Sequence, residues 1–164
     1  MDAPTIACYD REAALIAARH RSLDPAPWRP RFLAAFPRGG RVLDVGCGGG
    51  RDLALLLDLG FDGFGTDPSA GMREAAARAY PQLAGRIHDF GLPLPEPAAL
   101  GGLFDGIVCS AVLMHVPAEQ LPAALASLRR VLRRGGRLWV SVPGPCPTLR
   151  SQGRAGARDR VRRD

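Results

Sequence analysis

The chain has 164 residues, a length that is typical of one domain and sufficient for a hydrophobic core. Hydrophobic residues make up 46% and charged residues 23%, as in ordinary globular proteins, and no apolar run approaches the roughly 20 residues of a membrane span. The first residues lack a charged segment followed by an apolar one, so we expect no signal peptide, no membrane anchor and a cytoplasmic location.

The formal net charge of +6 raises the question of nucleic-acid binding, but the distribution of the charge argues against it. All 22 basic residues are arginines, which indicates a coding bias more than a selected binding patch. Residues 150–164 hold six Arg and two Asp, hence +4, which leaves only +2 for residues 1–149. We therefore expect a partner other than a nucleic acid.

The cysteine pattern indicates neither a metal site nor a disulfide framework. Cys8, Cys47, Cys109 and Cys146 lie far apart, with no C-x-x-C pair and no histidine cluster nearby. We expect free thiols in a reducing compartment and no bound metal.

The N-terminal segment predicts helices. Residues 10–21 have amphipathic spacing, with Asp10 as a candidate N-cap. Residues 22–30 form a proline-rich connector, and a second short helix follows and ends before Pro37. We expect residues 1–40 to form a helical lid in front of a sheet.

Residues 41–52, RVLDVGCGGGRD, are the most informative stretch of the sequence. A β-branched apolar run that carries Asp44 breaks into a glycine-rich turn, and Asp52 opens a helical pattern. Strand, glycine turn and helix N-terminus together form the layout of a nucleotide site in an open α/β sheet. Glycines permit positive φ and close approach of a ligand, and the helix start offers unpaired N–H groups.

The spacing of this turn argues against a dinucleotide site. In the pattern G-x-G-x-x-G, counted from Gly46, the third glycine position is held by Arg51. The sequence instead has the form D-x-G-x-G-x-G, and a carboxylate before the first glycine suits a ligand that carries an ammonium group. Here the chain resembles the class I S-adenosylmethionine-dependent methyltransferases, and its GCGxGRD form is similar to their small-molecule branch. The resemblance covers residues 8–145; the alternative is a glycine-rich turn without a ligand.

The resemblance implies that this first motif holds the methionine end of S-adenosylmethionine. Arg51 matches a partner for the methionine carboxylate, although a surface arginine is the alternative. Tyr9 matches an aromatic residue that opens the lid in the family, with a packing tyrosine as the alternative. The cofactor-binding residues expected in the motif are Asp44, Gly46, Cys47, Gly48, Gly50 and Arg51.

A second strand is predicted over residues 61–66 and ends at Asp67. This acid lies about 20 residues beyond the glycine turn, where a carboxylate accepts hydrogen bonds from ribose hydroxyls. The resemblance assigns that role to Asp67 and cofactor contacts to Pro68 and Met72. The alternatives are a helix N-cap for Asp67, which is compatible with ribose binding, and a core position for Met72.

A short strand is predicted over residues 85–88, and Asp89 and Phe90 follow it. In the family an acid at this position accepts a hydrogen bond from the adenine amino group, and the next backbone N–H meets the ring. Local turn capping is the alternative for Asp89.

A fourth strand is predicted over residues 104–110. The resemblance places Ser110 beside the methionine part of the cofactor. It also places His115 in a segment, LMHVP, that is similar to the family's LxHxP. We expect His115 to face the substrate pocket, where imidazole suits a general base, with a purely structural histidine as the alternative.

Residues 118–134 predict an amphipathic helix, and a strand follows over residues 135–143. The apolar stripe expected to face the sheet consists of Leu121, Leu125, Leu128 and Leu132. Residues 146–164 read as a basic, disordered tail, with a functional basic arm as the alternative.

The resemblance implies an α/β, three-layer Rossmann-like sheet, mainly parallel, over residues 41–145. We expect five strands in the order 3-2-1-4-5, without the last two strands of a complete family domain. The fifth strand then forms an uncovered edge, which favours pairing between two copies of the chain.

The function predicted by the resemblance is methyl transfer from S-adenosylmethionine to an unidentified small-molecule acceptor, weakened or lost because the chain is short. One alternative is a non-catalytic cofactor-binding or dimerising module. Another is a nicotinamide-dependent oxidoreductase, which the missing third glycine disfavours. The leading prediction requires the carboxylates of Asp44, Asp67 and Asp89 to converge on one cleft.

Overall fold

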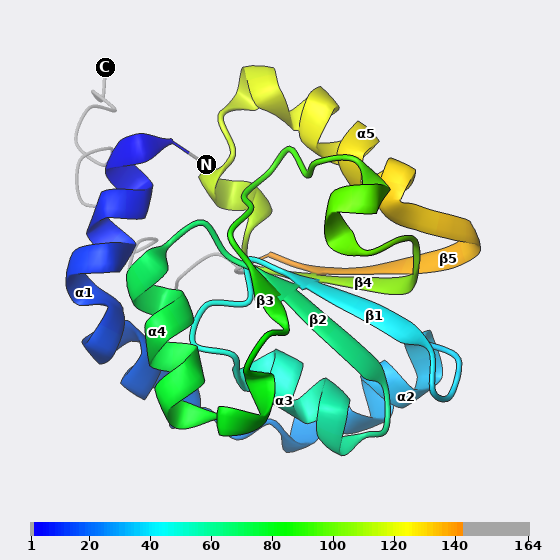
Figure 1. Ribbon diagram of the computed structural model, residues 1–164, viewed down its shortest axis with the longest axis horizontal. Helices are drawn as coiled ribbons and strands as arrows, with labels where there is room; N and C mark the ends of the chain where they lie inside the picture. The colour runs from blue at the N-terminus through cyan, green and yellow to red at the C-terminus, as the bar shows by residue number, and fades with distance from the viewer. Residues whose placement is uncertain (1, 143–164) are drawn as a thin grey trace, which may run out of the picture.

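The protein, described here from a computed structural model over residues 2–142, contains one five-stranded sheet in the order β3-β2-β1-β4-β5 (Figure 1). Every neighbouring pair of strands is parallel. The strands are β1 (Arg41–Val45), β2 (Asp62–Thr66), β3 (Ile87–His88), β4 (Phe104–Ser110) and β5 (Leu132–Ser141). The predicted strand order is confirmed. The predicted tail over residues 146–164 lies outside the described residues.

The part of the chain that the structure describes contains five α-helices. Figure 1 shows how they are arranged around the sheet. They are α1 (Ala3–Arg21), α2 (Arg29–Ala35), α3 (Arg51–Asp58), α4 (Ala70–Ala79) and α5 (Leu121–Val131). Single 3₁₀ turns occupy Ala26–Trp28, Pro81–Leu83, Pro97–Leu100, Leu113–His115 and Ala118–Gln120. Helices α2 and α3 pack on one face of the sheet and α5 on the other, so the fold has three layers.

The two faces follow from the alternation of side chains along a strand. Val42 of β1 and Val108 of β4 lie in a cluster with Phe32 of α2 and Leu56 of α3. The intervening residues face α5, where the cluster includes Leu43, Ile107, Ala124 and Leu128. Both faces of the central strands are therefore buried, as is usual in parallel sheets.

Helix α1 begins at Ala3, seven residues before Asp10, and the assignment of Asp10 as N-cap is wrong. The helix starts after Asp2, whose carboxylate accepts a hydrogen bond from the Thr5 N–H at 2.9 Å. Asp10 lies inside the helix, and its carboxylate accepts hydrogen bonds from Ser69 Oγ at 2.6 Å and Gly71 N–H at 2.9 Å. This acid therefore fastens α1 to the start of α4, a tertiary contact that local sequence did not reveal.

Helix α5 is shorter than predicted, and its buried stripe is rotated. Leu125 is 47% exposed, while Ala124, Ser127, Leu128 and Val131 are buried. The loop before β4 explains the rotation, because the Leu94 N–H donates to Ser127 Oγ at 2.9 Å and Arg130 donates to the Leu94 carbonyl at 2.8 Å. Leu132 has extended backbone and pairs with Phe104, so it belongs to β5 and not to the helix.

Candidate functional site

A cavity of about 580 Å³ lies at the carboxyl ends of β1, β2 and β4, where ligands bind in open α/β sheets. Helix α1, the glycine turn and the 3₁₀ turn Leu113–His115 contribute to its walls. The residues that line it are Tyr9, Arg19, His20, Leu23, Trp28, Asp44, Gly46, Cys47, Gly48, Gly49, Arg51, Asp52, Asp67, Ser69, Met72, Ser110, Ala111, Val112, Met114 and His115.

The glycine turn is shaped by close packing from two sides. Gly46 has a φ of +64°, and a Cβ atom there would lie 2.7 Å from Val112 Cγ2. A Cβ atom at Gly49 would lie 2.9 Å from Ala17 Cβ of α1. Larger residues at these two positions would push away the segment after β4 or helix α1. The turn thus keeps bare backbone against the cavity.

Asp44 is the most unusual polar group of the cavity. It is 1% exposed, and its Oδ2 atom has no hydrogen-bond partner. Burial raises the pKa of Asp44 well above its usual value, and the carboxylates of Asp52 and Asp67 raise it further. An isolated buried carboxylate is unfavourable, so this side chain is suited to a cationic ligand group that supplies both a hydrogen bond and a positive charge.

Asp67 ties the end of β2 to the glycine turn. Its Oδ2 accepts a hydrogen bond from the Gly48 N–H at 2.8 Å, and its Oδ1 accepts one from the Ser69 N–H at 2.9 Å. Burial raises the pKa of Asp67, and these two hydrogen bonds oppose that shift. A carboxylate has about four acceptor positions, so Asp67 retains capacity for ligand hydroxyls.

Asp89 is placed differently from the other two acids. Its side chain is 68% exposed, and it forms an ion pair with Arg73 at 2.7 Å between Nη1 and Oδ1. The same Arg73 Nη1 donates to the Asp67 carbonyl at 2.7 Å, so Arg73 links the ends of β2 and β3. Asp89 is not among the residues that line the cavity. The structure therefore brings two of the three predicted acids together there.

The other predicted site residues also divide into two groups. Gly46, Cys47, Gly48, Arg51, Met72, Ser110 and His115 line the cavity, whereas Gly50, Pro68 and Phe90 do not. Gly50 instead caps α3 with a φ of +81°, and a Cβ there would lie 2.6 Å from Leu83 Cδ1.

Burial raises the pKa of the Cys47 thiol well above its usual value, so the cavity contains a protonated thiol and not a thiolate.

Tyr9 and His115 meet across the cavity. The Tyr9 hydroxyl lies 3.1 Å from His115 Nε2, and the two rings pack edge to face with centroids 5.6 Å apart. Burial raises the pKa of Tyr9, so its hydroxyl stays protonated near neutral pH. This contact joins α1 to the segment that follows β4.

Sequence reasoning missed several residues of the cavity wall. The N-terminal segment contributes Arg19, His20, Leu23 and Trp28, and other positions contribute Asp52, Ser69, Val112 and Met114. The sequence indicated a lid over residues 1–40, but the inward face of a docked helix depends on its rotation. That rotation is set here by Ala13 and Ala17, which pack against Met72 and Ala75.

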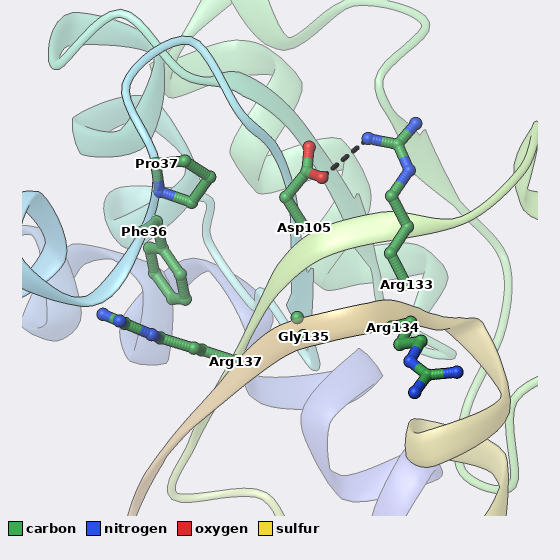
Figure 2. A pocket seen from close by; sticks show the side chains of 8 residues that line it. Phe36, Pro37, Asp105, Arg133, Arg134, Gly135 and Arg137 are labelled. Atoms are coloured by element: carbon green, nitrogen blue, oxygen red, sulfur yellow. Dashed lines mark hydrogen bonds and ion pairs between the residues drawn. The ribbon is translucent and has the colours of Figure 1, made fainter.

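A second cavity of about 340 Å³ lies at the opposite end of the sheet (Figure 2). Its carboxylate, Asp105, accepts hydrogen bonds from Arg133 Nη1 at 2.7 Å and from the Arg41 N–H at 2.8 Å. Arg137 donates to the carbonyls of Ala34 and Ala35, both at 3.1 Å. The side chains of Asp105, Arg133 and Arg137 have partners within the protein, so we assign this cavity no ligand.

Two kinds of feature are absent from residues 2–142. No group of three or more metal-ligating side chains is present in this part of the chain. None of its helices combines the length and the apolar character that a bilayer crossing requires.

Comparisons with known proteins agree with the geometry of the site. The profile of a methyltransferase domain family matches residues 17–162. A tRNA (carboxymethyluridine(34)-5-O)-methyltransferase of Xenopus tropicalis is 36% identical over 135 residues, which are 77% of this chain and 19% of that protein. A ubiquinone biosynthesis O-methyltransferase of Xanthomonas axonopodis pv. citri is 31% identical over 125 residues, which are 74% of this chain and 51% of that protein. The chain thus spans at most about half the length of these two relatives.

Among solved structures, a TehB-like SAM-dependent methyltransferase from Corynebacterium glutamicum superposes with a TM-score of 0.64 at 26% identity, over 85% of this chain and 73% of that one. The unpartnered Asp44 oxygen beside a bare glycine turn fits the ammonium end of S-adenosylmethionine, and Asp67 fits its ribose. The chain belongs to the class I S-adenosylmethionine-dependent methyltransferases.

Proposed function

We propose that this chain transfers a methyl group from S-adenosylmethionine to a small-molecule acceptor. The observation that supports this proposal most strongly is the buried, unpartnered Oδ2 of Asp44 on a cavity that Asp67 and the glycine turn also line. The Asp44 carboxylate lacks a protein partner, and the glycine turn beside it has no side chains that would keep a ligand away. A nucleoside ligand with a positively charged group would fit against this turn and supply the missing partner.

The protein's contribution to the reaction is mainly positioning. The sulfonium of S-adenosylmethionine supplies an already electrophilic methyl group. Asp44 holds the ammonium group, and Asp67 accepts hydrogen bonds from the ribose hydroxyls. Helix α1 covers the glycine turn and limits access of water. Holding donor and acceptor in line accounts for a large part of the rate in such reactions, so few catalytic side chains are needed.

The acceptor end of the cavity is proposed to be the apolar part, where Leu23, Trp28 and Met114 lie. Leu23 and Met114 are 51% and 58% exposed, which is consistent with a mouth that an apolar molecule would cover. A small acceptor is favoured over a nucleic acid because residues 1–149 carry only +2.

His115 is proposed to receive the proton that an acceptor hydroxyl loses. Its Nε2 atom is occupied by the Tyr9 hydroxyl at 3.1 Å. Proton transfer therefore passes through the tyrosine hydroxyl or follows the opening of this hydrogen bond.

Calorimetric titration with S-adenosylhomocysteine, the demethylated cofactor, tests the cofactor half of this proposal, with NAD as the comparison ligand. We expect saturable binding of S-adenosylhomocysteine at one site per chain and none of NAD. Binding of NAD alone would contradict the proposal. The acceptor half is tested by mass spectrometry of candidate hydroxyl and amine compounds after incubation with S-adenosylmethionine.

We also propose that two copies of the chain pair through β5. This strand contacts β4 on one side, and no strand among residues 2–142 pairs with its other edge. Leu138 and Val140 are each 40% exposed, and open apolar edges favour strand addition. Antiparallel pairing of two β5 strands centred on Leu138 would keep Arg133 and Arg134 of one copy away from those of the other.

Light scattering on the intact chain measures this association. We expect a dimer for the wild type and a monomer for Leu138→Lys. The matched control is Leu125→Lys, which places the same charge at a residue of similar exposure on α5 and should remain dimeric. A monomeric wild type at high micromolar concentration would contradict the pairing.

A further inference from the structure

Three basic side chains gather on the wall of the cavity that α1 provides. Arg19 and His20 lie in the last turn of α1, and Arg51 lies in the first turn of α3. Arg51 Nη1 is 3.5 Å from the His20 carbonyl, and His20 Nδ1 is 4.0 Å from the position a Cβ would take at Gly48. The cluster therefore borders the glycine turn.

This cluster has more positive than negative charge around it. Arg51 is paired with Asp52 at 2.8 Å, but no acid among residues 2–142 forms an ion pair with Arg19 or His20. The carbonyl end of a helix favours cations, so α1 supports positive charge at both positions. An anionic group placed here would complete the cluster.

The strand side of the same cavity has the opposite character. Asp44 and Asp67 lie there, and Asp44 Oδ2 has no partner. The cavity thus presents buried acids on one wall and basic side chains on the other. An amino-acid group carries an ammonium and a carboxylate a few ångströms apart, and this separation of charge matches it.

We propose that Arg19 and His20 bind the α-carboxylate of the cofactor's methionine group, and that His20 takes up a proton when the cofactor binds. This inference rests on the proposed function, because it assigns further residues to the same cofactor site. It also gives the C-terminal end of α1 a role in recognising the ligand, in addition to covering the glycine turn.

The proton uptake follows from the groups that face His20. Desolvation by the surrounding protein lowers the pKa of His20, Arg51 and Arg19 lower it further, and Asp52 opposes them. A carboxylate bound beside the ring favours the charged imidazolium and raises the pKa again. Between the lower pKa of the free protein and the higher pKa of the complex, binding adds a proton to His20, and affinity rises as pH falls through that interval.

Calorimetry with S-adenosylhomocysteine at pH 6.5, in buffers of low and high ionisation enthalpy, measures the number of protons taken up. We expect the wild type to take up more protons than His20→Gln, because any proton that Asp44 loses when it binds the ammonium group is lost equally by both proteins. A parallel titration uses 5′-methylthioadenosine, which lacks the amino-acid group. Arg19→Gln should weaken binding of S-adenosylhomocysteine about tenfold and leave binding of 5′-methylthioadenosine unchanged.

The matched control is Arg21→Gln, because Arg21 is in the same helical turn and does not line the cavity. We expect it to bind both ligands as the wild type does. Equal effects of Arg19→Gln and Arg21→Gln, or equal proton numbers for the wild type and His20→Gln, would overturn the inference while leaving the proposed function intact. A wild type that binds neither ligand would overturn both.

Discussion

The two ends of the sheet hold similar side chains and use them in opposite ways. At the amino ends of the strands, Asp105 accepts hydrogen bonds on both oxygens, one from Arg133 (Figure 2) and one from the Arg41 backbone N–H. At the carboxyl ends, Asp44 is almost fully buried and one of its oxygens has no partner. Both acids line cavities, but only the second lacks a partner that a ligand can supply.

The pKa shifts show the same contrast. The hydrogen bond from Arg133 lowers the pKa of Asp105, and the Arg41 N–H contributes further. Burial raises the pKa of Asp44. A satisfied acid stabilises the fold, whereas an unsatisfied buried acid destabilises the free protein and favours a cationic ligand. Both cavities of this chain contain charged residues, so their presence does not identify the functional one. The carboxylate oxygen that lacks a hydrogen-bond partner does.

The largest expected effect is that of Asp44→Asn on cofactor binding. Loss of the buried carboxylate should weaken binding of S-adenosylhomocysteine by roughly 2–3 kcal/mol, because its ammonium group loses a charged partner. Because the pKa of Asp44 is raised in the folded state, the folded protein holds this proton where the unfolded chain has lost it, so stability falls as pH rises from the unfolded value of 3.8 to the folded pKa. We therefore expect the free energy of unfolding at pH 7, from urea titration, to be unchanged or higher in the variant. A clear loss of stability with unchanged affinity for S-adenosylhomocysteine would show that Asp44 stabilises the fold, as Asp105 does, and does not bind the ligand.

Asp67→Ala should weaken binding of S-adenosylhomocysteine by roughly 1–3 kcal/mol, since the ribose hydroxyls lose an acceptor. Unlike Asp44→Asn, it should also lower stability, because the Gly48 and Ser69 N–H groups lose their acceptor. Calorimetry and urea titration on the same preparation separate the two effects. An unchanged dissociation constant would remove Asp67 from the site.

Asp105→Ala should lower the free energy of unfolding by about 1 kcal/mol and leave cofactor affinity unchanged, because its hydrogen bonds are internal to the protein. The pKa of Asp105 is lowered in the folded state, so its stabilising contribution is present above the unfolded value of 3.8 and is lost as pH falls through the folded pKa. Urea titrations of wild type and variant from pH 7 to pH 3 should therefore converge at the acidic end.

The smallest expected effect is that of Asp89→Ala, which should change cofactor affinity by less than about 1 kcal/mol because the side chain is exposed and paired with Arg73. The same calorimetric titration checks it. A loss as large as that of Asp67→Ala would show that Asp89 leaves Arg73 to bind adenine, as the resemblance to the family implied.

Local patterns made much of the architecture predictable. The β-branched run before the glycine turn predicted β1, and the acid about 20 residues later predicted the end of β2. These signals are strong because strand, turn and helix start are set by neighbouring residues. The predictions that failed concern contacts between distant segments. Asp10 was assigned to a helix start, and Leu125 to a buried face, because neither pattern includes the element that packs against them.

The sequence by itself determined the order of elements, the cofactor class and the acids at the tips of β1 and β2. Only the tertiary structure decided that Arg19 and His20 border the cofactor cavity, that Asp89 pairs with Arg73, and that Asp44 keeps an unpartnered oxygen. The physical reason is the range of the forces involved. Backbone preferences and helix or strand periodicity act within a few residues, whereas the burial and pairing of a side chain depend on which distant surface packs over it.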